Sequence, residues 1–235
     1  MKTKISLLVL FIAFSISSAF SHALWIETSS TGQKGKAQEV KIFFGEYESK
    51  EPDTAAKWFS NLKDFKIMVT APNGKSQFLT TAQETLFYKG TFTPDQDGVY
   101  KLSVVHEVAA VFEHAKIEYY AFADVAVGSG KKVAGFPAGA ALTLQPEKNT
   151  TKTAETAYIA LLNKAAFAKQ KIAIVNPDGS KQNPETDDKG KFVANTTQKG
   201  NYFIEAFTED KTPGQLNGKD YEKVWHLATY FTEVK

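Results

Sequence analysis

The sequence predicts an all-β protein made of two β-sandwich modules. First, most of the chain consists of short alternating or aromatic-rich segments separated by turn residues, at the spacing typical of sandwiches and barrels. Second, the same order of turn and strand occurs twice along the chain. Third, one Gly-rich stretch is long enough to connect two such modules.

Residues 1–21 are expected to be a secretion signal and not part of the fold. Lys2 and Lys4 precede the apolar run at residues 5–16, and Ala19 and Ser21 are the small residues of a cleavage site. The mature chain is then expected to begin at His22, although cleavage after Ala19 remains an alternative. The apolar run is too short for a membrane span, and no later segment is long enough. We therefore expect an exported protein, periplasmic or secreted, without a membrane span and without a lipid-anchor cysteine.

Nine segments after the signal combine β-branched or aromatic residues with an alternation of apolar and polar side chains, as half-buried strands do. The expected strands span residues 40–46, 65–71, 99–108, 118–127, 157–163, 171–176, 191–197, 201–209 and 223–234. One or two helical turns are expected at residues 53–62, where Asp53 or Thr54 stands in an N-cap position.

A repeated motif divides these strands into two similar halves. Pro-Asn-Gly within residues 69–75 is followed by Gly-Val-Tyr at the start of residues 98–104. In the second half, Pro-Asp-Gly within residues 174–180 is followed by Gly-Asn-Tyr at the start of residues 200–206. Proline presets φ and glycine permits positive φ, so both tripeptides predict turns. The Gly-x-Tyr pair is similar to the start of an immunoglobulin-type strand, where a tyrosine packs back at the sheet corner.

The Gly-rich connection at residues 127–139 is where the two halves are expected to meet. It predicts an N-terminal module at residues 22–130 and a C-terminal module at residues 131–235. The absence of cysteine means that core packing, and not disulfides, must stabilise both modules.

Composition excludes several classes of function. Once Lys2 and Lys4 are removed, basic and acidic residues balance, so no nucleic-acid partner is expected. No arginine occurs, which removes bidentate recognition of phosphate or carboxylate. Without cysteine, and with Met68 as the only methionine after the signal, soft-ligand binding of Cu(I) is not expected.

Motifs of common enzyme classes are incomplete, and the chain is predicted not to be an enzyme. Residues 106–110 begin like a zinc-protease helix, but Ala110 replaces the second histidine. Residues 128–132 lack the upstream glycine and the hydroxyl of a phosphate-binding loop. No Gly-x-Ser-x-Gly motif occurs.

The candidate metal ligands are the four histidines, His22, His106, His114 and His226. His22 differs from the others because a chain that begins there also offers its α-amine. An amine has an ordinary pKa of about 7.7–8.0, so a metal ion displaces its proton readily near neutral pH. Amine and imidazole nitrogens suit Ni(II), Cu(II) or Zn(II). The alternative is that His22 merely follows the cleavage site.

A second ligand is expected, because two nitrogens leave a divalent ion with open positions. His106 is the preferred candidate, since it lies in the same module as the first strand. It also alternates with apolar residues, which is more typical of an ordinary core histidine. His226 is the next candidate, and His114 is expected at an exposed hairpin tip. Glu205, between two phenylalanines, is expected at a sheet edge or an interface, in reach of a ligating imidazole.

The order of these features resembles the exported family catalogued as domain of unknown function 4198, which is linked to nickel uptake. The matching segments are residues 22–27, 119–128, 135–146, 186–206 and 224–231. The resemblance implies an immunoglobulin-like module followed by a prealbumin-like, or transthyretin-like, module. It also implies a role in metal uptake or metal binding, and no catalytic activity.

Three functions are consistent with the sequence. The first is an exported binding protein for a divalent transition metal, nickel or copper rather than zinc, with a membrane transporter component as a further partner. The second is a non-catalytic adhesion or carbohydrate-contact module, which an aromatic content of 13% and an exposed Trp58 would support. The third is a copper oxygenase in which an N-terminal histidine and a second imidazole form a histidine brace.

Overall fold

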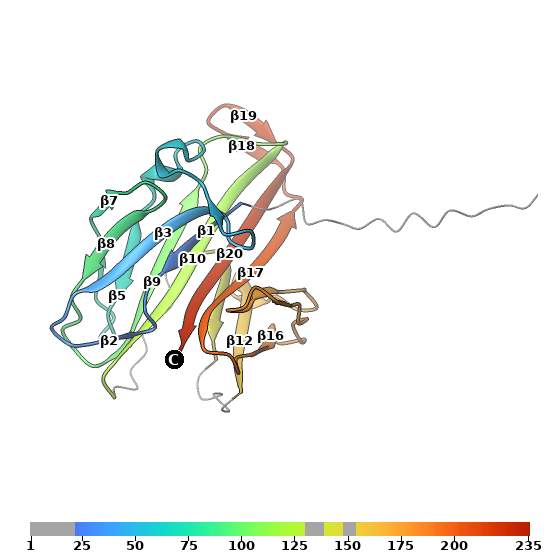
Figure 1. Cartoon of the computed structure of the whole chain (residues 1–235). Coiled ribbons are helices and arrows are strands. Elements are labelled where there is room, and N and C mark those ends of the chain that lie inside the picture. Colours follow the sequence, from blue (N-terminus) through green and yellow to red (C-terminus); the bar gives the residue numbers. More distant parts are fainter. Residues whose placement is uncertain (1–21, 130–138, 148–153) are drawn as a thin grey trace, which may run out of the picture.

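The computed structural model describes residues 22–129, 139–147 and 154–235, and in these ranges the protein is almost entirely strand and turn (Figure 1). The expected signal segment and most of the predicted connection between modules therefore lie outside the described residues. The helical content of the described ranges consists of two short 3₁₀ turns, Ala55–Lys57 and Leu62–Asp64, close to the helical turns expected at residues 53–62.

The strands form three main sheets and one hairpin. The first sheet has the order β1 (Ala23–Glu27), β3 (Gln38–Glu46), β8 (Tyr88–Phe92) and β7 (Thr81–Gln83), with β4 (Glu51–Pro52) paired to β3. The second has the order β15 (Lys181–Gln182), β14 (Ala173–Val175), β17 (Gly200–Asp210), β20 (Lys223–Val234), β10 (Ala115–Val127), β9 (Gly98–Glu107), β5 (Ile67–Thr70) and β6 (Ser76–Phe78). A short strand β2 (Thr31–Gly32) pairs with β10.

The third sheet contains β11 (Leu142–Pro146), β12 (Glu155–Leu162) and β13 (Ala165–Ala166), with β16 (Lys191–Asn195) paired to β12. The hairpin consists of β18 (Gly214–Leu216) and β19 (Lys219–Tyr221). All nine predicted strands are present within a few residues of their expected bounds, and the all-β sandwich class is confirmed.

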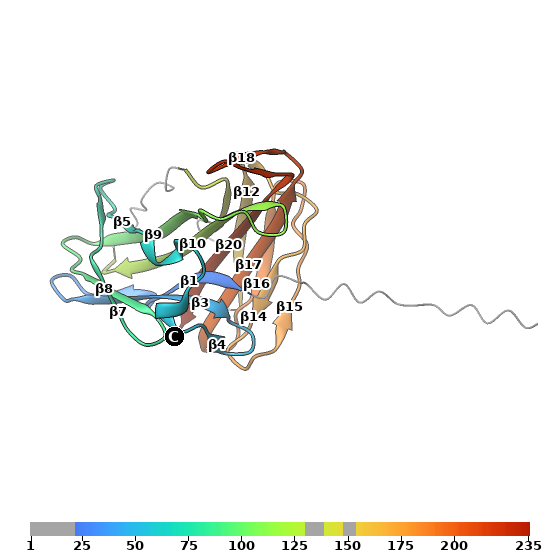
Figure 2. The ribbon, with the colours of Figure 1, turned by 90° about the horizontal axis from the view of Figure 1, so that it is seen from above.

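The second sheet is continuous across both predicted modules, and we call it the central sheet. Strand β10 from the first half pairs in parallel with β20 from the second half, from Ala115 opposite Lys223 to Ala123 opposite Phe231. In Figure 1 these two strands run side by side through the middle of the molecule. Figure 2 shows β5 and β15 on opposite sides of them. The two halves are therefore joined by a shared sheet and not only by the connecting segment.

Each face of the central sheet has its own core. Alternation along β20 places Trp225 and Leu227 in the core beneath β1 and β3, and Ala228 and Tyr230 in the core beneath β11, β12 and β16. This explains why residues 118–127 are almost continuously apolar, because a strand buried on both faces needs apolar side chains at every position.

The repeated Gly-x-Tyr motif forms the same corner in both halves. The hydroxyl of Tyr100 donates to Asp95 Oδ1 at 2.7 Å and accepts the backbone N–H groups of Asp95 and Gln96, each at 3.0 Å. The hydroxyl of Tyr202 donates to the carbonyl of Gln198 at 3.0 Å and accepts its N–H at 3.2 Å. The predicted tyrosine corners are confirmed.

The prediction of an exposed Trp58 is wrong. Its side chain is buried and packs against the rings of Phe44, Phe65 and Tyr88, because the two 3₁₀ turns fold over the end of the first core. The structure contains no helix, among the residues it describes, that is long and apolar enough to cross a membrane.

Candidate metal and ligand site at His22

His22 is the first described residue and lies immediately before β1. Its imidazole Nε2 is 3.6 Å from Oδ1 of Asp53, which is ion-pair range. The two side chains keep 46% and 39% of their surface exposed. The pair is therefore accessible to a ligand from solution.

The backbone of β3 and β4 holds Asp53 beside the start of β1. Ala23 pairs with Gly45 of β3, and the N–H of Asp53 donates to the carbonyl of Phe44 at 2.8 Å. Gly45 is required here, because it has a φ of +138° and an added Cβ would lie 2.7–2.8 Å from backbone atoms of residues 51–53. In the sequence, Asp53 is notable only because it stands in an N-cap position of the expected helical turns. Its approach to His22 depends on this long-range pairing.

The His22 and Asp53 side chains stand at one side of a cavity of about 370 Å³, which we call the His22 cavity. Its walls are mainly aromatic. The ring of His22 is 5.5 Å from that of Phe44, and the exposed rings of Phe59 and Phe112 meet edge to face at 6.0 Å. The remaining lining residues are Glu113, Ile117, Tyr119, Trp225 and Leu227.

Tyr119 connects the cavity wall to the backbone of His22. Its hydroxyl donates to the backbone carbonyl of His22 at 3.4 Å. Burial raises the pKa of Tyr119 well above its ordinary value, with a further contribution from the charge of Glu205. The hydroxyl therefore stays protonated near neutral pH and acts as a donor to the His22 backbone.

His226 lies on the opposite face of the central sheet from the His22 cavity. Its Nδ1 is 3.0 Å from the hydroxyl of Tyr120 and 3.2 Å from Glu118 Oε2. Burial opposes ionisation of Glu118, but hydrogen bonds from His226, Lys116 and Tyr120 prevail and lower its pKa to about 2. His226 is thus part of a buried polar network in the second core.

His106 and His114 also lie apart from this cavity. His106 is buried on the first-core face of β9, and its Nε2 has no hydrogen-bond partner among the described residues. Burial lowers the pKa of His106, so its ring is neutral near pH 7. His114 is in the exposed turn before β10, as expected, 3.8 Å from the carboxylate of Glu222.

The four histidines therefore do not converge. Among residues 22–129, 139–147 and 154–235, no group of three or more His, Asp or Glu side chains is placed to hold a metal ion. That finding concerns side chains, and the α-amine of a chain beginning at His22 would add a donor. Metal binding by His22, His106, His226 and His114 stays a prediction, and the geometry favours His22.

Glu205 lies on the face of the central sheet that β1 crosses. It pairs with Thr229 on β20, and the hydroxyl of Thr229 donates to the carbonyl of Leu24 at 2.8 Å. Burial, and secondarily the charge of Glu48, raises the pKa of Glu205 to about 7. The expectation of a carboxylate at an interface is met between β1 and β17.

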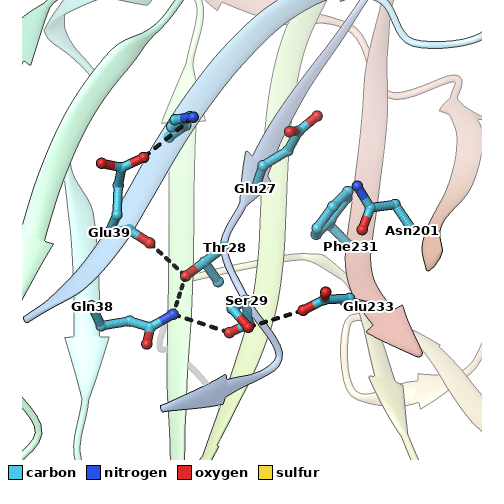
Figure 3. Close-up of a pocket in the computed structure, with 9 residues that line it drawn as sticks. Glu27, Thr28, Ser29, Gln38, Glu39, Asn201, Phe231 and Glu233 are labelled. Atoms are coloured by element: carbon cyan, nitrogen blue, oxygen red, sulfur yellow. Dashed lines mark hydrogen bonds and ion pairs between the residues drawn. The ribbon is translucent and has the colours of Figure 1, made fainter. Parts of the chain in front are cut away.

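A second cavity, of about 430 Å³, lies at the other end of β1 (Figure 3). Its polar groups bind one another. The amide of Gln38 donates to Thr28 Oγ1 at 2.8 Å, and the hydroxyl of Thr28 donates to the carbonyl of Glu39 at 2.6 Å. The hydroxyl of Ser29 donates to Glu233 at 2.9 Å. These contacts stabilise the turn after β1.

A third cavity, of about 550 Å³, lies between the β3–β4 turn and the turn before β17. Like the His22 cavity, it contains aromatic rings that pack against one another. Trp25 stacks on Phe43 at 5.3 Å, and Tyr47 stacks on Phe203 at 4.2 Å. The His22 cavity differs from both others, because it combines aromatic walls with an exposed imidazole and carboxylate.

A comparison with protein families matches most of the chain. The model of the family described as a domain of unknown function (DUF4198) matches residues 19–210. The chain belongs to this family. The DUF4198 match includes His22, Asp53 and most of the central sheet, and it confirms the resemblance seen in the sequence. A comparison with curated proteins finds no match.

Two solved structures are similar to this chain over part of their length. A DUF4785 family protein from Legionella pneumophila has 12% sequence identity and a TM-score of 0.33, and the match covers 78% of this chain and 51% of that chain. Trypsin-activated α-2-macroglobulin from Escherichia coli has 11% identity and a TM-score of 0.30, covering 92% of this chain and 16% of that one. The chain thus spans about half of the first protein and less than a fifth of the second.

Proposed function

We propose that the protein is an exported, non-catalytic binding protein for a divalent transition metal, with His22 at the mature N-terminus as the primary ligand. The observation that carries the proposal is the half-exposed pair of His22 and Asp53 in the lining of the His22 cavity. His22 is also the residue before which the signal sequence is expected to be cleaved.

The two nitrogens of the imidazole have different roles in this proposal. Nδ1 is the ring nitrogen that can close a small chelate ring with the α-amine of the same residue. Nε2 faces Asp53 at 3.6 Å, and a carboxylate beside the second nitrogen of a ligating histidine fixes its tautomer and ring orientation. Asp53 is therefore a positioning residue, and the α-amine and Nδ1 of His22 are the ligands.

The donor set favours nickel or copper over zinc. Amine and imidazole nitrogens suit Ni(II) and Cu(II), and affinity for such sites rises toward copper in the divalent series. The chain belongs to DUF4198, and the resemblance to this family implies a role in nickel uptake. We therefore propose that the ion is delivered to a transporter component. The expected signal sequence supports a periplasmic or secreted location.

The test compares two forms of the mature protein. One begins at His22, and the other carries a Gly-Ser-Gly-Ser extension ahead of His22, which moves the α-amine too far away to share an ion with the imidazole. Affinity for Ni(II) and Cu(II) is measured by isothermal titration calorimetry at pH 7.5. We expect the extension to weaken binding at least tenfold while the far-ultraviolet spectrum stays unchanged.

Two outcomes would overturn the proposal. Equal affinity of both forms would show that the α-amine is not a ligand. Absence of measurable binding by the form that begins at His22 would remove the metal role altogether. Intact mass of exported protein provides a separate check, since a chain that retains Phe20 and Ser21 would not present His22 at its terminus.

A further inference from the structure

We propose that the His22 cavity receives the metal ion as a complex with a small aromatic chelator, and not as a free ion. This inference rests on the proposed function, because it assumes that His22 holds the ion. It adds the class of cargo: a planar nitrogen-donor molecule whose rings occupy the cavity while its metal meets His22.

The first argument is the number of ligands. The α-amine and Nδ1 of His22 occupy two positions of an ion that takes four to six donors. His226 lies behind the central sheet and His106 is buried within the first core, so neither faces the cavity. The hydroxyl of Tyr119 donates to the backbone carbonyl of His22. Several positions of the ion are therefore left for a molecule that enters with it.

The second argument is the chemistry of the walls. A bare ion needs only its donor atoms, whereas this cavity of about 370 Å³ has the size and apolar lining of a small-molecule site. The ring of Trp225 meets that of Phe112 edge to face at 6.4 Å. The rings of Phe44 and Tyr119 meet in the same way at 5.7 Å. Such surfaces favour a flat ring system, which packs against them by stacking or edge contacts.

The third argument is the exposure of the cavity rim. Phe59 and Phe112 line the cavity, keep 41% and 46% of their surface exposed, and meet edge to face. Large apolar side chains grouped at a cavity mouth are typical of a ligand-binding surface. An aromatic ligand would cover both rings, and a hydrated ion would leave them in water.

The fourth argument is charge. Asp53 and Glu113 supply carboxylates to the lining, and no lysine is among the lining residues. A divalent ion bound by a neutral chelator keeps its positive charge, so the complex is attracted to this opening. A chelator that carries several carboxylates would cancel that charge and lose the attraction.

The test uses two neutral chelators with the same number of nitrogen donors. Nickel is supplied as its one-to-one complex with 2,2′-bipyridine, which is aromatic, or with ethylenediamine, which is aliphatic. Calorimetry on the mature protein is expected to give an affinity at least tenfold higher for the bipyridine complex. Metal-free bipyridine is the third probe, and we expect it to bind at least tenfold more weakly than its nickel complex.

A matched pair of variants tests whether the preference for the bipyridine complex depends on an aromatic ring of the His22 cavity. Phe112→Ser removes an exposed ring from the cavity rim, and Phe78→Ser removes an exposed ring on β6, outside the cavity lining. We expect Phe112→Ser to abolish most of the bipyridine preference while affinity for Ni(II) alone changes less than twofold. Phe78→Ser is expected to change neither quantity.

The outcomes separate this inference from the proposed function. If Ni(II) binds through the α-amine but both complexes bind equally well, the aromatic-chelator inference is overturned and the metal function stands. The same holds if Phe112→Ser and Phe78→Ser behave alike, or if metal-free bipyridine binds as tightly as its complex. If the Gly-Ser-Gly-Ser extension has no effect on Ni(II) affinity, the metal function itself fails.

Discussion

Nε2 of His22 lies 3.6 Å from Oδ1 of Asp53, and the backbone N–H of the same aspartate is bound to the carbonyl of Phe44 at 2.8 Å. The carboxylate is thus held by the strand that pairs with β1, and not by a free loop. A side chain held in this way can orient an imidazole without being a ligand itself.

Asp53→Asn is predicted to weaken Ni(II) binding by about 10–100-fold, the range typical of partners that orient a ligating histidine. The amide of asparagine carries no negative charge, so it favours less the His22 tautomer in which Nε2 carries the proton. Asp53→Glu should recover part of the affinity, because it restores the charge. Calorimetry measures both effects. Glu51→Gln, on the neighbouring exposed position of β4, is the control and should bind as the wild type does. Equal affinity of Asp53→Asn and wild type would exclude the positioning role.

Glu205→Gln is predicted to stabilise the protein at alkaline pH. The pKa of Glu205 is about 7 in the folded state and about 4.5 ordinarily, so the folded state disfavours the charged form. The wild type therefore loses stability as pH rises from about 4.5 through 7. Each pKa unit corresponds to about 1.4 kcal/mol, so the variant should gain no more than about 3 kcal/mol at pH 8 and close to nothing at pH 4.

Urea denaturation at both pH values measures this difference. Glu155→Gln, at an exposed position of β12, is the control and should show no pH-dependent gain. A Glu205→Gln protein that is equally or less stable than wild type at pH 8 would show that the carboxylate is well solvated.

Tyr100→Phe and Tyr202→Phe are each predicted to lower the free energy of unfolding by about 1–2 kcal/mol. Tyr100→Phe leaves the N–H groups of Asp95 and Gln96 without their acceptor, and Tyr202→Phe does the same to the N–H of Gln198. Urea denaturation provides the measurement. Tyr221→Phe, on the β18–β19 hairpin, should change stability by less than about 0.5 kcal/mol. Similar losses in all three variants would mean that the corners have no special role.

A fragment of residues 22–130 is predicted not to fold alone. It lacks β20, which pairs with β10 over most of its length and places Trp225 and Leu227 in the first core. Amide dispersion in a nitrogen–proton correlation spectrum and far-ultraviolet circular dichroism measure the outcome. The full mature chain is the control. A well-dispersed spectrum of the fragment would show that the first half is an independent module, as the sequence alone suggests.

The strands and corners could be predicted because their signals are local. Alternation marks one buried face wherever it occurs, and the Gly-x-Tyr motif carries its own partners within a few residues. Short strands such as β18 and β19 were missed because a span of three residues has no measurable period. Trp58 was assigned to the surface because nothing local shows which element will cover a ring.

The pairing of β10 with β20 could not be predicted, because register between strands separated by about a hundred residues leaves no local pattern. The candidate site at His22 also depends on a long-range pairing that leaves no local pattern. His22 was identified from its place in the chain, whereas Asp53 depends on the β1–β3–β4 pairing. Alternation correctly placed His106 on an apolar face, but it could not show that His226 faces the other core.

The position of β20 within the central sheet has a consequence for the order in which this protein can assemble. Residues 223–234 are synthesised after β10 and β17, yet they lie between these two strands and supply side chains to both cores. Until they leave the ribosome, neither sandwich is complete, and the edges of β10 and β17 are open to other chains. Neither core can therefore close during synthesis before residues 223–234 are available to pair with β10 and β17.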